Sequence, residues 1–198
     1  MGEAEWVDLR ERLREILREK SLRLAPPGKP FVLTSGLTSN HYIDGKKTTS
    51  DPEGLHCLAR LLLENCRREQ VESIGGPTIG ADPIVGAVAL LSYINDHPLP
   101  LFLVRKDPKT HGTKSKLEGV DIKSKRVIIV DDVITTGGSV LDAIEAVRSA
   151  GAEVVKVVAI VDREQGGREA FKQAGIRYEP IFSIRDILPE GYLLSEST

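Results

Sequence analysis

Apolar residues near the start of the chain recur three and four positions apart, which is the spacing of an amphipathic helix. The residues on this face are Trp6, Leu9, Leu13, Ile16 and Leu17. The predicted helix ends before APPGKP (25–30), because consecutive prolines cannot continue it. FVLTSG (31–36) and HYID (41–44) then predict two short strands joined by a polar turn.

From residue 51 onward, the pattern predicts helices that alternate with apolar strands. The expected helices cover about 51–68, 80–94, 139–152 and 166–175. The expected strands cover 71–77, 99–105, 126–130, 154–162 and 178–184. This alternation is typical of a mostly parallel sheet covered by helices on both faces, so the fold class is α/β. We expect one domain over residues 1–198, with residues 1–50 forming a small N-terminal hood.

The composition changes this picture little but excludes several classes of protein. Hydrophobic residues make up 40% of the chain, and the net charge of −2 argues against a basic nucleic-acid-binding surface. No apolar run is long enough to cross a membrane, and the first residues are too charged for a secretory signal. Cys57 and Cys66 are nine positions apart in one predicted helix and should point to opposite faces, so we expect no disulfide and a reducing, cytoplasmic location.

Residues 127–139, VIIVDDVITTGGS, combine two features that seem opposed. Glycine-rich turns before helices bind phosphate through backbone N–H groups, yet Asp131 and Asp132 place two negative charges beside this turn. The carboxylates could simply cap the loop or the next helix. They could also accept hydrogen bonds from ribose hydroxyls, face a hydrated Mg²⁺, and favour a sugar ring that becomes cationic. A ribose 5-phosphate whose C1 becomes positive would satisfy every part of the motif.

This string resembles the phosphoribosyl pyrophosphate (PRPP) signature of the type I phosphoribosyltransferases. The resemblance implies their fold, with a mostly parallel central sheet, flanking helices and an N-terminal hood. The residues that it assigns to PRPP are Asp131, Asp132, Val133, Ile134, Thr135, Thr136, Gly137, Gly138 and Ser139. It also implies that Mg²⁺ binds mainly through PRPP, with no direct metal ligand from the protein.

Residues 105–119, RKDPKTHGTKSKLEG, form a long polar connection with five Lys or Arg and two acidic residues. A solvated basic loop is the plain interpretation, but connections of this length are often functional. The spacing of Arg105, Lys106, Lys109 and His111 resembles the catalytic loop of the orotate phosphoribosyltransferase family. That resemblance implies that the four residues neutralise a departing pyrophosphate, with Lys109 most important for the rate. It further implies a homodimer in which this loop completes the neighbouring active site.

Two other segments carry the same resemblance. FVLTSGLTSNHYID (31–44) is similar to the segment at the pyrimidine site of that family. Arg163, after a predicted strand, resembles the arginine that receives orotate, and Thr135 would also contact orotate. The planar guanidinium suits this task because it pairs with a carboxylate through two hydrogen bonds. Taken alone, Arg163 could equally be an exposed charge at the end of a strand.

The chain departs from the family pattern at two positions. Many members have a lysine where this chain has Thr34, and many have another where it has Gly80. Both differences remove positive charge from the substrate region. We hypothesise that Lys46 or Lys47 replaces part of that charge, the alternative being two solvated lysines.

The resemblance implies the transfer of ribose 5-phosphate from PRPP to orotate, giving orotidine 5′-monophosphate and pyrophosphate. A purine phosphoribosyltransferase would share the PRPP core, but purines offer no carboxylate for Arg163. A regulator that senses PRPP and binds nucleic acid is a rival of another class, which the acidic composition disfavours. The chain has no room for a second domain that would decarboxylate the product.

Overall fold

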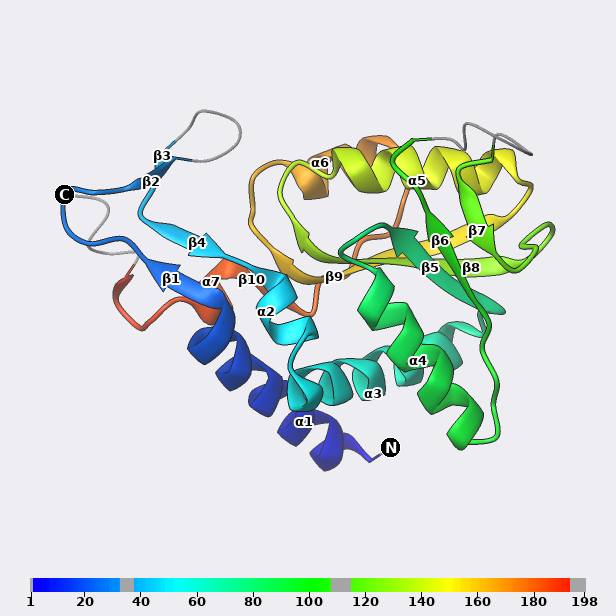
Figure 1. Ribbon diagram of the computed structural model, residues 1–198, viewed down its shortest axis with the longest axis horizontal. Helices are drawn as coiled ribbons and strands as arrows, with labels where there is room; N and C mark the ends of the chain where they lie inside the picture. Colours follow the sequence, from blue (N-terminus) through cyan, green and yellow to red (C-terminus); the bar gives the residue numbers. More distant parts are fainter. Residues whose placement is uncertain (1, 33–37, 108–114, 193–198) are drawn as a thin grey trace.

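A six-stranded sheet lies at the centre of the protein within residues 2–32, 38–107 and 115–192, which the computed structural model describes (Figure 1). The strand order is β10-β9-β8-β5-β6-β7, and only the β6–β7 pair is antiparallel. The strands are β5 (Ser73–Pro77), β6 (Leu101–Val104), β7 (Leu117–Gly119), β8 (Arg126–Ile134), β9 (Glu153–Asp162) and β10 (Phe182–Ser183). The predicted α/β class with a mostly parallel sheet is therefore confirmed.

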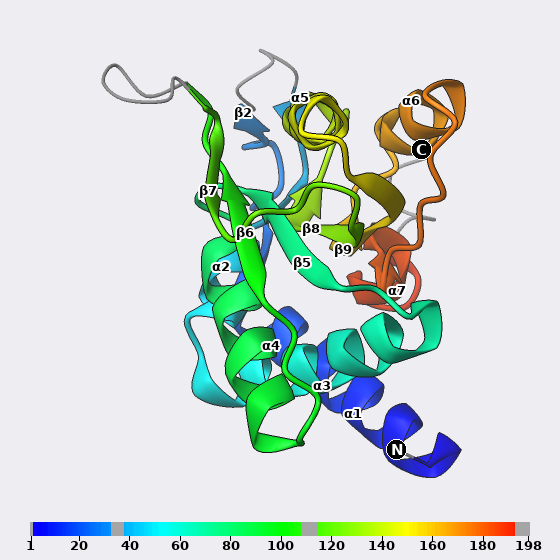
Figure 2. The ribbon, with the colours of Figure 1, turned by 90° about the vertical axis from the view of Figure 1, so that its right-hand side faces the viewer.

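Helices cover both faces of this sheet (Figure 2). One face carries α1 (Glu3–Ile16), α3 (Pro52–Glu69) and α4 (Asp82–Ile94), and the other carries α5 (Gly138–Ser149) and α6 (Gly167–Gln173). Side chains on β8 alternate between the two cores because successive residues of a strand point to opposite faces. Ile128 and Val130 lie in the core with α1, α3 and α4, whereas Val127 and Ile129 lie in the core with α5.

The hood consists of two antiparallel strand pairs beside the carboxyl edge of the sheet (Figure 1). Its strands are β1 (Leu22–Leu24), β2 (Phe31–Val32), β3 (Thr38–Ser39) and β4 (His41–Ile43). A π-helical turn, η1 (Leu17–Ser21), leads into the hood, and α2 (Gly45–Thr49) leads out of it. The C-terminal part holds it in place: α7 (Ile184–Ile187) accepts hydrogen bonds from Arg18 through the carbonyls of Asp186 and Ile187.

Several expected boundaries differ from the structure. The strand predicted at 126–130 continues to Ile134, because Val133 and Ile134 keep pairing with β9. β7 was not predicted, since three residues are too few to show a period of two. The strand predicted at 178–184 is only Phe182–Ser183, and its last position begins α7. Cys57 and Cys66 are buried and free, as expected. No helix among the described residues is both long and apolar enough to cross a bilayer.

The contact between β5 and β8 depends on the absence of a side chain at Gly76. A Cβ there would overlap the carbonyl oxygen of Val130 on β8 and lie 2.7 Å from the Cβ of Ala81. Both neighbours are fixed by the sheet and by the start of α4, so neither can move cheaply. The carboxyl ends of β5 and β8 can therefore approach each other only with glycine at this position.

Gly76→Ala should lower the free energy of unfolding by about 3 kcal/mol or more, because the added methyl group collides with backbone. Gly86→Ala is the matched control: it lies in α4, where nothing stands within 4 Å of the added Cβ. Removing a glycine from a helix interior should raise stability by about 0.5–1 kcal/mol. Urea unfolding of both variants checks this, and equal stabilities would contradict the close approach of β5 and β8.

Candidate active site

The turn between β8 and α5 has the geometry of an anion-binding loop. Gly137 has a φ of 85°, a conformation that residues with a side chain rarely adopt, and α5 begins directly after it. No described side chain caps this end of α5, so its first N–H groups remain available to an anion. A cavity of about 220 Å³ opens here, lined by Asp131 and residues 133–140. The structure thus brings the predicted turn residues 135–139 together around one hollow.

The two carboxylates lie at the inner wall of this region. Asp132 is only 6% exposed, and its Oδ1 accepts a hydrogen bond of 2.8 Å from the Val133 N–H. Asp131 accepts one of 2.9 Å from the Asp132 N–H. Burial, together with the negative charge of Asp132, raises the pKa of Asp131 above its ordinary value. A ligand that donates hydrogen bonds to the ionised carboxylates would therefore stabilise them.

Gly80 lies directly against this carboxylate pair. A Cβ at this position would come within 3.0 Å of oxygen atoms of both Asp131 and Asp132. The lysine of many family members could not occupy position 80 without displacing one of the carboxylates. Among the described residues, the opposing charge comes from α2 instead: the Lys46 Nζ lies 3.6 Å from Asp132 Oδ2. Lys47 is exposed and forms no ion pair with a described residue.

Arg105 and Lys106 extend from the carboxyl end of β6 towards the same turn. They line a cavity of about 170 Å³ together with Thr78, Ser139 and Asp142. Ser139 also lines the cavity at the Gly-rich turn, so the two hollows are neighbours. The Arg105 backbone N–H donates to the Lys116 carbonyl at 2.8 Å, which ties the start of the basic connection to its end. Lys109, His111 and Thr34 lie outside the described residues, so their predicted roles remain predictions.

Arg163 is buried at the carboxyl end of β9, contrary to an exposed strand-end charge. Its side chain has Nε and Nη2 atoms that are shielded from solvent and have no hydrogen-bond partner among the described residues. The adjacent Asp162 does not serve it, because its oxygens lie near the Glu164 N–H and the Arg168 guanidinium. Burial lowers the pKa of Arg163, while nearby Tyr42 acts in the opposite direction. Such an arginine lacks an anionic partner.

Tyr42 and Thr78 were not singled out in the sequence. Tyr42 comes from the hood and lies near Arg163, and Thr78 follows β5 and lines the cavity of Arg105 and Lys106. Alternation in HYI could have identified Tyr42, since Ile43 is buried and its neighbour must point the other way. Thr78 carries no comparable signal, because its place depends on the packing of β5 beside β6.

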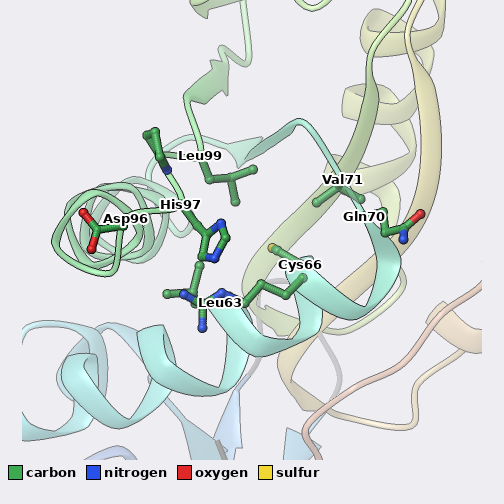
Figure 3. Close-up of a pocket in the computed structure, with 9 residues that line it drawn as sticks. Leu63, Cys66, Gln70, Val71, Asp96, His97 and Leu99 are labelled. Atoms are coloured by element: carbon green, nitrogen blue, oxygen red, sulfur yellow. The ribbon is translucent and has the colours of Figure 1, made fainter.

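Another cavity lies elsewhere in the protein, and Figure 3 shows it. It has a volume of about 530 Å³ and lies between the end of α3 and the connection from α4 to β6. Leu63, Cys66 and Leu99 are among its lining residues. These segments precede β5 and β6, so this cavity is at the amino edge of the sheet. In open α/β sheets ligands bind beyond the carboxyl ends of strands, which favours the carboxylate site.

Comparison with known proteins gives a consistent result. The family model of the phosphoribosyl transferase domain matches residues 62–175. An orotate phosphoribosyltransferase of Rhodopseudomonas palustris (strain BisB5) is 44% identical over 183 residues, covering 90% of this chain and 96% of the relative. One of Aquifex aeolicus (strain VF5) is 40% identical, covering 90% and 97%. The crystal structure of Mycobacterium tuberculosis H37Rv orotate phosphoribosyltransferase in complex with PRPP has a TM-score of 0.74 and 31% identity, covering 90% and 98%.

Arg163→Met should raise the free energy of unfolding of the ligand-free protein by about 1–2 kcal/mol, because it removes buried donors that lack partners. Arg185→Met serves as the control, since Arg185 is exposed, is paired with Glu164, and should change stability little. Urea unfolding without ligand measures both. A loss of stability in Arg163→Met would show that the guanidinium is already satisfied in the folded protein.

Proposed function

The chain belongs to the orotate phosphoribosyltransferase family, and from this premise we propose how its own residues carry out the reaction. The reaction transfers ribose 5-phosphate from PRPP to orotate, giving orotidine 5′-monophosphate and pyrophosphate in pyrimidine synthesis. The observation that best supports this assignment is the buried guanidinium of Arg163, which lacks a partner beside a phosphate-binding turn. Orotate carries the carboxylate that such a group requires.

The Gly-rich turn holds the 5′-phosphate of PRPP. Backbone N–H groups at the start of α5 and the hydroxyls of Thr135, Thr136 and Ser139 donate to its oxygens. Asp131 and Asp132 accept hydrogen bonds from the ribose hydroxyls. Their negative charge also favours the cationic ribose that forms as pyrophosphate leaves C1 and the orotate ring nitrogen attacks it. The carboxylates and the phosphate turn thus act on different ends of one sugar.

Arg163 orients the base through two hydrogen bonds to the orotate carboxylate. This pairing satisfies the donors that are buried without a partner in the described protein. Thr135 contacts orotate as well; in support, the Arg163 N–H donates to the carbonyl of its neighbour Ile134 at 2.9 Å, so the turn begins beside this strand end. An uncharged base would leave Arg163 unpaired, which gives selectivity against purines and uracil.

The leaving pyrophosphate meets the basic connection that begins at Arg105 and Lys106. Lys109 and His111 complete this charge, and Lys109 matters most for the rate. A loop is suited to the task because it can close on PRPP and open to release the products. Arg105 and Lys106 line a cavity together with Thr78 and Ser139, so the start of the loop lies beside the proposed PRPP site, which supports this role.

Mg²⁺ fits this site as a companion of PRPP. The described residues contain no group of three or more His, Cys, Asp or Glu side chains that could hold a metal ion by themselves. Two neighbouring carboxylates suit a hydrated Mg²⁺ that takes its other ligands from substrate oxygens. Asp131 and Asp132 would face its water, and the ion would neutralise charge on the pyrophosphate when bound.

We also propose a homodimer in the cytoplasm. On α4, three large apolar side chains stay exposed: Leu90 (64%), Tyr93 (73%) and Ile94 (65%). An exposed apolar surface of this kind supports self-association. In the dimer, residues 105–119 would complete the site of the partner subunit. The buried, unpaired Cys57 and Cys66 are consistent with a reducing compartment.

Loss of orotate absorbance on adding PRPP tests the function directly. We expect Mg²⁺-dependent consumption of orotate and no consumption of adenine, hypoxanthine or uracil under the same conditions. Turnover of another base would keep the PRPP site but refute the role of Arg163. No turnover of any base would favour a PRPP sensor instead.

Lys109→Ala should lower kcat by roughly 100-fold or more, as loss of a donor to developing charge does. Orotate binding, measured by calorimetry, should stay unchanged because Lys109 acts at the pyrophosphate. Lys123→Ala, which removes an exposed lysine outside the basic connection, is the charge-matched control. An unchanged kcat in Lys109→Ala would show that the loop is not catalytic.

The same variant tests the dimer when it is mixed with Asp131→Asn/Asp132→Asn, which should itself be folded and nearly inactive. If the loop acts on the partner's site, random mixed dimers restore about a quarter of the sites. Activity that fails to recover in a mixture of exchanging dimers would mean that each loop serves its own subunit.

A further inference from the structure

We propose that Lys46 is a positioning residue of the ribose site, which holds Asp132 in the orientation that accepts the ribose hydroxyls. This inference rests on the proposed function, since it concerns how the same carboxylates are prepared for PRPP. It assigns a role to only one of the two lysines in DGKKTT (44–49). Lys46 acts through Asp132 and need not contact the reacting atoms.

The contact involves the one oxygen of Asp132 that the backbone leaves unserved. Oδ1 accepts the Val133 N–H at 2.8 Å. Oδ2 is buried and has no hydrogen-bond partner among the described residues, and the Lys46 Nζ lies 3.6 Å from it. The Lys46 side chain is 55% exposed, so its ammonium reaches the carboxylate from the solvent side of the site. A charge in this place fixes the rotation of the carboxylate.

The position of Lys46 follows from how α2 packs. Asp44 caps this short helix by accepting the Lys46 N–H at 3.2 Å, and its Oδ1 lies 3.5 Å from the Lys46 Nζ. At Gly45 a Cβ would lie 2.8 Å from the Cβ of Asp132, so the first turn of α2 sits directly on that residue. The far end is anchored by a buried hydrogen bond of 2.7 Å between Thr48 and Ser21. The backbone of Lys46 is therefore fixed beside Asp132, so its side chain starts within reach of that carboxylate.

No competing cation reaches the pair within the described residues. On the side opposite α2, Gly80 offers only backbone, because any side chain there would meet both carboxylates. Lys47 projects from the same helix but is exposed and forms no ion pair with a described residue. Lys46 thus supplies the positive charge that the sequence lacks at position 80.

The groups that face the carboxylates explain why this charge matters. Asp44, at the start of α2, adds a third negative charge near the pair. The charge of Asp131 also contributes to raising the pKa of Tyr178, which lies in the segment before β10. Burial lowers the pKa of Lys46, but Asp132 and Asp44 together raise it above its ordinary value, so the amine stays protonated. Lys46 also lowers the pKa of Asp131, which burial and the charge of Asp132 raise, so without Lys46 the ionised form of Asp131 would be lost at a higher pH.

Steady-state kinetics test the proposal, with wild-type protein that has been shown to turn over orotate as the reference. The variants are Lys46→Met, Lys46→Arg and the control Lys47→Met. In Lys46→Met we expect kcat/KM for PRPP to fall roughly fivefold or more at pH 7, as loss of a partly exposed ion pair allows. The acidic limb of its pH profile should move to higher pH, and the KM for orotate should not change. Lys46→Arg should restore most of the loss, and Lys47→Met should resemble wild type.

Three outcomes would overturn the proposal while leaving the proposed function intact. They are an unchanged kcat/KM for PRPP in Lys46→Met, an equal loss in Lys46→Arg, and a loss with an unshifted pH profile. Thermal unfolding of each variant guards against a trivial loss of structure. If Lys46→Met proves unstable, Lys46→Gln provides the same neutralisation with a polar side chain and is held to the same outcomes. Absence of turnover in the wild type would instead refute the proposed function.

Discussion

Two adjacent carboxylates, one buried and one partly buried, are costly to keep ionised, and the arrangement of the site follows from this cost. Asp131 and Asp132 lie towards the end of β8, directly after the buried apolar residues 127–130. Backbone N–H groups of the strand itself serve one oxygen of each residue. The rest of the stabilisation comes from α2, which rests on Asp132. On the opposite side Gly80 leaves the room that both carboxylates occupy.

The order of strands arranges the charges that surround this pair. Arg163 follows β9 on one side of β8, and Arg105 and Lys106 follow β6 on the other, with β5 between β6 and β8. Cationic, anionic and cationic groups therefore follow one another along the carboxyl edge of the sheet. The proposed substrate has the same sequence of partners: a base with a carboxylate, a ribose that becomes positive, and a pyrophosphate. In a parallel sheet the carboxyl ends of neighbouring strands lie side by side. Residues that follow these strands are therefore brought close together by the fold itself.

The sequence predicted the sheet, its helices and the phosphate turn because their signals are local. A run such as VIIV, a cap such as Asp51-Pro52, and a glycine turn each act over a few residues. The burial of Arg163 could not be predicted, since it depends on neighbours such as Tyr42 of the hood, which is far away in the chain. Nor could Lys46 be separated from Lys47: they are adjacent in sequence, and only the seating of α2 on Asp132 decides which one faces the carboxylates. The predicted strand stopped at residue 130, whereas β8 continues to Ile134, because two consecutive acidic residues are more typical of the position after a strand than of its interior.

The hood is held by both ends of the chain, and this has a consequence for biosynthesis. Arg18 donates a hydrogen bond to the Ile187 carbonyl, and the Tyr192 hydroxyl donates one of 2.8 Å to the Asn40 carbonyl. Leu17 shares a core with Ile184 and Ile187, which are synthesised much later than Leu17. During synthesis on the ribosome, the apolar face of the N-terminal segment stays exposed until these partners have been made. Chaperones can bind such an exposed apolar surface. The hood is thus synthesised before the partners that hold it and reaches its final structure only after them.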